Sequence, residues 1–367
     1  MDLKQRLQIC VVGMAIFSMF FGGGNLTFPL WVGATTSSVS LSSLGFLLSG
    51  VLLPFYGIII SLYFKGDYRH YLSACGKTFG ALLVFSLLLF WIPLGSGPRC
   101  NQLAYGAFAV QTGWNIPFWI YSALYSGLVY MLTVRKMRII EILGKIITPL
   151  LILTLGMFIY AIFTMSTAPA SVASGPWNDL SNSFFAGYHT MDFIAAIFFS
   201  ASVIELVKEK ERDKFDLRLI RNACLAAIGL LSAIYIGLIT VGHSQAETLL
   251  HVPRDRLLAL IGQQLLASEL QPILFLVITL SVLSTSMALS LVFSDYMRKS
   301  FFKDKLEHKW CLLISVLLSF FMSIIGFESI ATLISYATAF LYPCLLVVTT
   351  VAIAKSFRNR EYVTQRP

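Results

Sequence analysis

Long apolar runs separated by short polar segments occupy almost the whole sequence. Each run approaches or exceeds the roughly 20 residues that an α-helix needs to cross a bilayer. Ten runs meet this requirement, at residues 9–34, 41–64, 79–108, 116–134, 146–165, 184–206, 222–242, 272–293, 310–326 and 329–353. The pattern therefore predicts an all-α polytopic membrane protein, built as a single transmembrane domain over residues 1–367.

The basic residues fall into the polar segments on one side of the predicted membrane. With the N-terminus placed in the cytoplasm, 24 of the 27 Lys and Arg lie on the inner side, and the exceptions are Arg99, Arg254 and Arg256. Short cytoplasmic loops of membrane proteins carry an excess of Lys and Arg. We therefore predict ten spans with both termini in the cytoplasm.

The composition agrees with a membrane protein and argues against several other classes of protein. The chain is 57% hydrophobic and only 12% charged, whereas about a quarter of the residues in a soluble domain are charged. The net charge of +9 reports membrane topology, so no nucleic-acid partner is expected. Neither an HExxH motif nor a Ser/His/Asp set occurs, which argues against an enzyme, and no GxxxxGK[ST] loop suggests a nucleotide or another cofactor.

The longest predicted outer segment covers residues 243–271. After Pro253 its leucines and isoleucine cluster on one side of a helix, at positions 257, 258, 260, 261, 265 and 266. This spacing predicts an amphipathic helix that lies over the outer face.

The first apolar run is interrupted in its middle by FFGGGNLTFP, Phe20–Pro29. A bilayer supplies no water to backbone groups freed by a broken helix, so such groups are costly unless they line a cavity. A broken helix presents N–H groups at the start of one half and carbonyls at the end of the other, which suits an anionic group together with a cation. The alternative is a glycine-lined helix crossing or a proline kink.

A second interruption lies in the sixth run, FFAGYHTMDFIAAIFFS, residues 184–200. Five spans separate it from the first, so a repeat of five would be inverted in the membrane. Interrupted spans at matching positions of two halves are a sequence pointer to a transporter binding site. We take as candidate substrate ligands Gly22, Gly23, Gly24, Asn25, Gly187, Tyr188, Thr190 and Asp192.

The segments MFFGGGNLTFP (residues 19–29) and GYHTMDFIAAIFF (residues 187–199), with Gly97, Pro98 and Arg99 in the third run, resemble the bacterial branched-chain amino acid:cation symporter family. The resemblance implies uptake of leucine, isoleucine and valine with sodium or protons across the bacterial inner membrane. It also implies a five-plus-five inverted repeat like that of the sodium-coupled leucine transporter, with repeats near 9–165 and 184–353. Members usually have about twelve spans, so this chain would be a short one.

The resemblance also implies a sodium site between the first and eighth spans. By similarity, Ser18 and Phe21 would contribute carbonyl oxygens, and Ser284 and Thr285 hydroxyl oxygens, with Ser281 one turn earlier. The amide oxygen of Asn25 is a further candidate, because hard cations prefer oxygen ligands. The alternative for the hydroxyls is hydrogen bonding to the preceding turn. Their retention favours sodium over the proton as the coupling ion.

Ionisable groups within the spans are expensive and seldom face lipid. Asp192 could receive a substrate ammonium group, relay a proton, or pair with a buried partner such as Arg99. His189 could titrate in a proton-coupled protein or serve as a neutral structural residue, and Arg99 could instead reach the outer interface. Tyr105 and Tyr188 could cap a pocket or belong to an aromatic belt.

The sequence is compatible with two further hypotheses about function. The coupled solute could be another small amino acid or organic molecule, exchanged or moved with protons. A channel fits less well, because the polar positions are isolated breaks and form no continuous polar lining. The sequence gives no oligomeric state.

Overall fold

The computed structural model describes residues 22–134, 174–200, 217–266 and 270–358, with isolated positions 13, 17, 149, 152, 153, 156, 157, 160 and 268. Within these ranges all regular structure is helical. The elements are α2 (Gly23–Thr35), α3 (Val39–Leu47), η1 (Leu48–Leu52), α4 (Leu53–Tyr63), α5 (Tyr68–Leu72), α6 (Lys77–Trp91), η2 (Ile92–Ser96), α7 (Gly97–Thr112), α8 (Phe118–Val134), α11 (Pro176–Tyr188), α13 (Leu217–Ser244), α14 (Ala246–Leu249), η4 (Arg254–Arg256), α15 (Leu257–Leu265), α16 (Gln271–Tyr296), η5 (Met297–Phe301), α17 (His308–Ile324) and α18 (Phe327–Arg358).

Several of these elements join into helices long and apolar enough to cross a membrane. Among the described residues these are Val39–Tyr63, Lys77–Thr112, Arg221–Ser244, Gln271–Phe301 and Phe327–Arg358. Two shorter apolar helices, Phe118–Val134 and His308–Ile324, complete the set. All seven coincide with predicted spans, which confirms a multi-pass protein whose described residues are all-helical. The predicted fifth span, 146–165, lies largely outside the described residues.

The two predicted interruptions fall at helix ends. Gly22 has an extended backbone, and α2 begins at the next residue, inside the first apolar run. In the sixth run α11 ends at Tyr188, and helix resumes over residues 192–200. Between them Met191 has a φ of +62°, a left-handed conformation that a residue with a side chain rarely adopts. The sixth span is therefore broken, as its sequence predicts.

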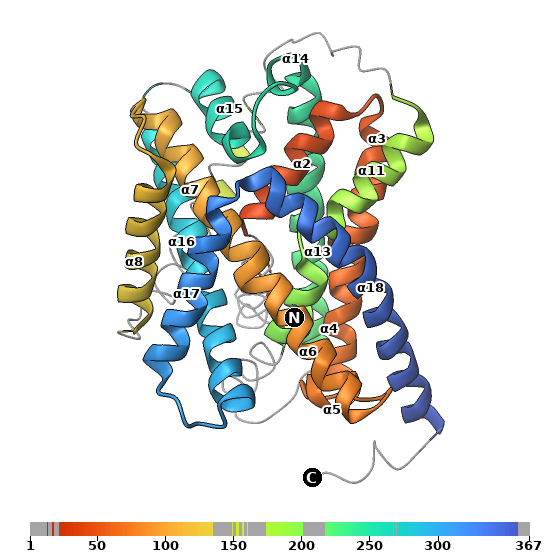
Figure 1. Cartoon of the computed structure of the whole chain (residues 1–367). Helices are drawn as coiled ribbons and strands as arrows, with labels where there is room; N and C mark the ends of the chain where they lie inside the picture. The colour runs from red at the N-terminus through yellow and green to blue at the C-terminus, as the bar shows by residue number, and fades with distance from the viewer. Residues whose placement is uncertain are drawn as a thin grey trace.

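The helices form two groups (Figure 1). The first, here called the glycine bundle, contains α2, α11, α13 and the continuous run α3–η1–α4, which pack on one another. The second, here called the serine bundle, contains α8, α16, α17, α7 and the π-helical segment η2 that joins α7 to α6. Its helices share a separate apolar cluster that includes Leu103, Tyr125, Val282 and Leu312. The breaks in the first and sixth runs lie where the two bundles meet.

Glycines let the helices of the glycine bundle approach closely. A Cβ atom at Gly33 of α2 would lie 2.1 Å from the Ile239 carbonyl oxygen, and one at Gly242 of α13 would lie 2.2 Å from that of Leu30. Gly45 of α3 meets the Leu180 carbonyl of α11 in the same way, at 2.4 Å. Without a hydrophobic driving force between helices in lipid, such close backbone contact is what holds them together.

The crossing of α2 and α13 gives a first prediction. Gly242→Ala should lower the stability of the detergent-purified protein by about 1–3 kcal/mol, because the added methyl group overpacks a backbone contact. Gly229→Ala is the matched control in the same helix, since nothing lies within 4 Å of its Cβ position. The measurement is the thermal unfolding midpoint. Equal midpoints for the two variants would contradict the crossing.

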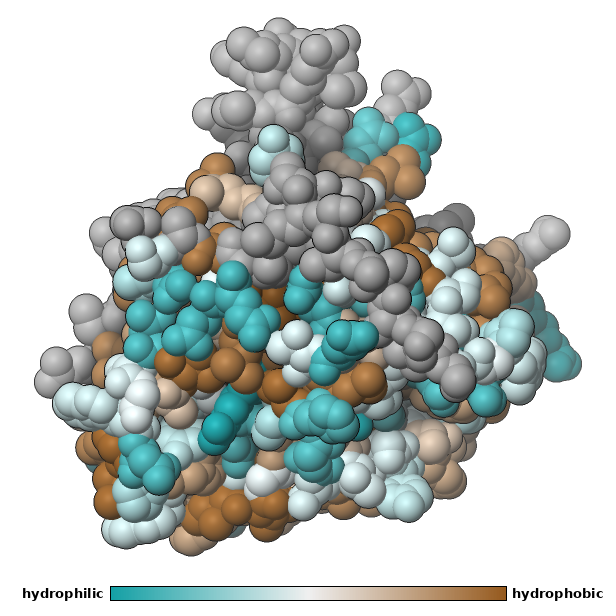
Figure 2. All heavy atoms as spheres, turned by 90° about the horizontal axis from the view of Figure 1, so that it is seen from above, coloured by the Kyte–Doolittle hydropathy of each residue, from teal (hydrophilic) through white to brown (hydrophobic). Residues whose placement is uncertain are grey.

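At the end expected to face outward, α13 is followed by α14, η4 and α15, and α15 covers most of the stretch predicted to form an amphipathic helix. Leu257, Leu258 and Ile261 are buried, and Gln263 is exposed, so α15 is amphipathic. Viewed onto this end, hydrophilic residues gather near the middle, with apolar residues among and around them (Figure 2).

Candidate functional site

A small cavity lies at the junction of the two bundles, where both broken runs meet. Its lining comes from four segments of the chain and comprises Gly22, Gly23, Gly24, Asn25, Trp91, Ser96, Arg99, Cys100, Thr190, Asp192, Ala195, Phe199, Thr285 and Leu289. Its volume is about 30 Å³. A buried water requires on the order of 10–15 Å³ by this measure, so the cavity as it stands has room for only a few waters.

Asn25 and Asp192 join the two broken runs directly. The Asn25 amide donates hydrogen bonds to the Asp192 carboxylate and to the Tyr235 hydroxyl, and its oxygen accepts one from the Gly22 N–H at 3.2 Å. The Tyr235 hydroxyl also donates to Asp192, at 3.4 Å. Thr190 Oγ1 donates to the Gly187 carbonyl at 2.8 Å and accepts from the Asp192 N–H at 3.4 Å. The Asp192 carboxylate is thus held at the cavity wall by Asn25 of α2 and Tyr235 of α13, and Thr190 fixes the backbone beside it.

Arg99 of α7 is the second charged group at the cavity and is only 1% exposed. Its Nη1 donates to the His189 carbonyl at 2.6 Å, at the end of α11, where a cation is favoured by the helix dipole. Its guanidinium carbon lies 5.3 Å from the centre of the Phe28 ring. None of the ion pairs among the described residues involves Arg99, and its Nε has no partner. Within the described part of the chain, Arg99 is therefore a buried cation with no carboxylate at ion-pair distance.

The described part of the expected cation site lies on α16, beside Gly22. Thr285 lines the cavity, and a methyl group at Gly22 would lie 3.9 Å from its Oγ1. Both Thr285 and Ser284 donate their hydroxyl hydrogens to the Ser281 carbonyl, at 3.0 and 2.8 Å. The hydroxyls therefore bond to the preceding turn, which was the alternative to a cation site. Each hydroxyl oxygen still has lone pairs that a cation could use. Ser281 and Ser284 are outside the cavity lining, and Ser18 and Phe21 lie outside the described residues.

Two of the candidate substrate ligands lie away from the cavity. Gly187 packs on η1, where an added Cβ would lie 2.0 Å from Ser49 Oγ. Tyr188 packs its ring on Tyr342, 4.6 Å between centres, and its carbonyl accepts from the Tyr342 hydroxyl at 3.2 Å. The remaining six candidates, the three glycines with Asn25, Thr190 and Asp192, all line the cavity.

The structure adds lining residues that the sequence did not single out. Trp91 and Phe199 form an edge-to-face pair, 5.3 Å between ring centres, and Leu289 and Ala195 complete an apolar wall. Ser96 ends the π-helical segment η2, a distortion often found at functional sites. Pro93, near the start of η2, is the feature of the sequence that could have indicated this distortion, because a proline inside a membrane helix frees backbone groups.

Aromatic and ionic contacts close the side of the breaks that is expected to face outward. Phe28 packs against His189 and Phe327, with ring centres 5.6 and 6.5 Å apart. Farther out, Arg254 of η4 lies 4.0 Å from the centre of a Trp31 ring and pairs with Glu328 at 3.3 Å. The apolar wall instead lies toward the expected inner ends of its helices, so the cavity extends inward.

Comparisons with known proteins agree with this geometry. Residues 5–366 match the family model described as branched-chain amino acid transport protein. The chain is 27% identical over 383 residues to a Staphylococcus saprophyticus protein named as a branched-chain amino acid carrier, covering 97% of this chain and 84% of that one. It is 28% identical to the branched-chain amino acid permease BraB of Bacillus subtilis, covering 96% and 81%. Its fold is similar to the inward facing conformation of Mhp1, with a TM-score of 0.64 at 13% identity over 94% of this chain and 76% of that one.

Proposed function

The chain belongs to the branched-chain amino acid transport protein family, and from this premise we propose that it imports leucine, isoleucine and valine together with a coupling ion by alternating access. The observation that carries the proposal is the cavity between the bundles, where the interrupted first and sixth runs meet a buried arginine. Family and fold support a multi-pass transporter. To these we add ten spans, cytoplasmic termini and a five-plus-five inverted repeat, in line with the sodium-coupled leucine transporter fold of Mhp1.

The two charged groups of the cavity suit the two charges of an amino acid. Burying a charge in a membrane span costs about 2.5–3.5 kcal/mol on insertion scales, unless a partner offsets it. Arg99 lacks such a partner among the described ion pairs, and it lies beside the N-terminus of α2, which also favours an anion. We assign the substrate carboxylate to Arg99 and to the N-terminus of α2 at Gly23 and Gly24, and the ammonium group to Asp192.

The apolar wall suits the aliphatic side chain. Phe199, Ala195 and Leu289 have purely apolar side chains, and Trp91 adds the large apolar surface of its indole ring. One methylene is worth about 1–3 kcal/mol in such a pocket, so leucine, isoleucine and valine would share it. Because the cavity has a volume of only about 30 Å³, binding requires the wall to move apart, and the boundary between the bundles is where it can do so.

We place the coupling ion between α2 and α16, near Thr285 and Ser284. Replacing both residues with alanine should remove two candidate oxygen ligands while leaving the α2–α11 contact in place. Leucine uptake should then need at least about tenfold more sodium for half-maximal rate, as expected when about 1.4 kcal/mol of ion binding is lost. The measurement is uptake into proteoliposomes over a series of sodium concentrations.

Ser290→Ala with Ser294→Ala is the matched control for that change, since both serines lie farther along α16 and outside this cavity. An unchanged sodium dependence in the Ser284 and Thr285 variant would count against the ion site.

The test of the whole proposal compares driving forces. Purified protein in proteoliposomes should concentrate labelled leucine inside when an inward sodium gradient is imposed. An imposed pH gradient alone should have little effect. Accumulation with the pH gradient alone would favour the second candidate, proton coupling, for which Asp192 and His189 are nearby titratable groups. Failure to accumulate leucine, isoleucine or valine under either gradient would refute the proposal.

A further inference from the structure

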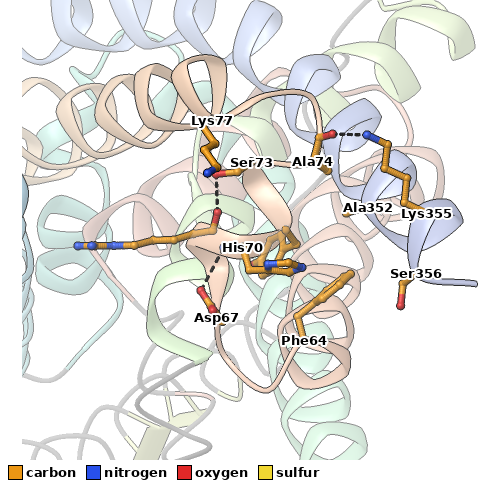
Figure 3. Close-up of a pocket in the computed structure, with 11 residues that line it drawn as sticks. Phe64, Asp67, His70, Ser73, Ala74, Lys77, Ala352, Lys355 and Ser356 are labelled. Atoms are coloured by element: carbon orange, nitrogen blue, oxygen red, sulfur yellow. Dashed lines mark hydrogen bonds between the residues drawn. The ribbon is translucent and has the colours of Figure 1, made fainter. Parts of the chain in front are cut away.

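A second, larger cavity lies away from the transport site, on the side expected to face the cytoplasm. It has a volume of about 670 Å³ and is open to the surface. Its walls come from α5, the turn between α5 and α6, and the end of α18. Figure 3 shows Lys77 and Lys355 on either side of the turn that carries Ser73 and Ala74. We call this cavity the basic groove.

Cations outnumber anions in the basic groove. Arg69, Lys77 and Lys355 line it with His70, and Asp67 is the only carboxylate among the described residues of the lining. That carboxylate is already engaged, since Asp67 Oδ1 accepts from the His70 N–H at 3.0 Å as the N-cap of α5. Lys355 donates one hydrogen bond, to the Ala74 carbonyl at 2.6 Å, and an ammonium group has three hydrogens to donate. The groove therefore has donors and positive charge left for an anion.

Backbone groups add to this preference. Helix α6 starts at Lys77 on the rim of the groove, its N-cap Gly76 has no side chain to cap it, and its first turn contains no acidic residue. A helix N-terminus carries partial positive charge and unpaired N–H groups, which favour phosphate. Lys77 and this terminus thus reinforce one another on one wall, and Lys355 lies on the other.

Exposed apolar side chains lie on the helices that form the groove. Phe357, next to Ser356, is 70% exposed, and its ring lies 6.1 Å from that of Tyr63, whose hydroxyl bonds Ser356 at 3.0 Å. On α6, Phe79 and Leu82 are exposed as well. Free phosphate needs no such surface, whereas a phospholipid needs one for its acyl chains. We infer that the basic groove binds the phosphate headgroup of an anionic phospholipid, with its chains along α4, α6 and α18.

The experiment uses the purified full-length protein in a neutral detergent. Phosphatidylglycerol is titrated in mixed micelles, and binding is followed by native mass spectrometry and by the thermal unfolding midpoint. The test variant is Lys77→Gln with Lys355→Gln, which removes both charges and keeps a polar, uncharged side chain at each position. The matched control is Lys303→Gln with Lys305→Gln, which removes the same charge from exposed positions on the same expected face.

We expect the test variant to bind phosphatidylglycerol about tenfold more weakly, since each lysine near a lipid surface contributes appreciably to attraction. The control should match the unchanged protein, and phosphatidylcholine should bind weakly to all three. Equal weakening in both variants would overturn the inference, because it would show attraction by overall charge. Full competition by millimolar inorganic phosphate, with equal thermal protection, would also overturn it, because the ligand would then be free phosphate.

Discussion

Replacing Arg99 with glutamine should lower the kcat/KM for leucine uptake by about 100-fold, while the protein still inserts and folds. The expected loss follows from the assignment of the substrate carboxylate to Arg99, since removing one partner of a buried charge pair costs 2–5 kcal/mol. Arg99→Lys should recover part of the activity, because lysine keeps the charge but loses the planar donor fork. Initial rates in proteoliposomes give the measurement.

A structural role for Arg99 would predict a different pattern. Its bond to the His189 carbonyl contributes to the fold, so loss of activity alone does not identify a carboxylate ligand. Leucinol, which lacks the carboxylate, should therefore be compared with leucine in a binding assay. The unchanged protein should strongly prefer leucine, and the glutamine variant should bind the two about equally. Arg221→Gln, an exposed arginine at the start of its span, is the control. A preserved preference for leucine in the Arg99 variant would refute the assignment.

The sequence predicted the breaks because irregular backbone and polar side chains are rare in apolar runs. Three glycines with an asparagine, and a threonine and a carboxylate after a glycine, stand out against such a background; the three glycines, Asn25, Thr190 and Asp192 line the cavity. The multi-pass, all-helical architecture followed from the length of the apolar runs for the same reason. In both cases a polar group in lipid is costly, so a short stretch of sequence is enough to indicate the feature.

Other parts of the site depend on contacts that no local pattern shows. In the sequence, Tyr235 is one more aromatic residue in an apolar run, yet its hydroxyl accepts a hydrogen bond from Asn25, 210 positions earlier. Gly187 resembles the glycines of the first break, but it serves a close contact with Ser49. Arg254 was an exception to the charge pattern, and its partners Trp31 and Glu328 lie in distant parts of the chain. Such roles arise from tertiary packing, which a single sequence does not reveal.

Replacing Asp192 with asparagine should also lower leucine uptake by about 100-fold, since the substrate ammonium group would lose its anionic partner. The change keeps the size of the side chain, and the new amide oxygen can still accept the hydrogen bond from Asn25. The fold and the contact between the two broken runs should therefore persist. Thermal unfolding of the purified variant checks this point, and proteoliposome uptake gives the rate.

The role of Asp192 can be separated from a role in ion coupling by a substrate analogue. 4-Methylpentanoate has the carboxylate and side chain of leucine but no amino group, so the unchanged protein should bind it far more weakly than leucine. If Asp192 binds the ammonium group, the asparagine variant should bind the two with similar affinity, and Tyr235→Phe, which leaves the carboxylate in place, should keep the preference. If Asp192 instead binds the coupling ion, the asparagine variant should keep its preference for leucine and change its sodium dependence. That second result would contradict the proposed arrangement, because the ammonium group would then need a different partner at the cavity wall.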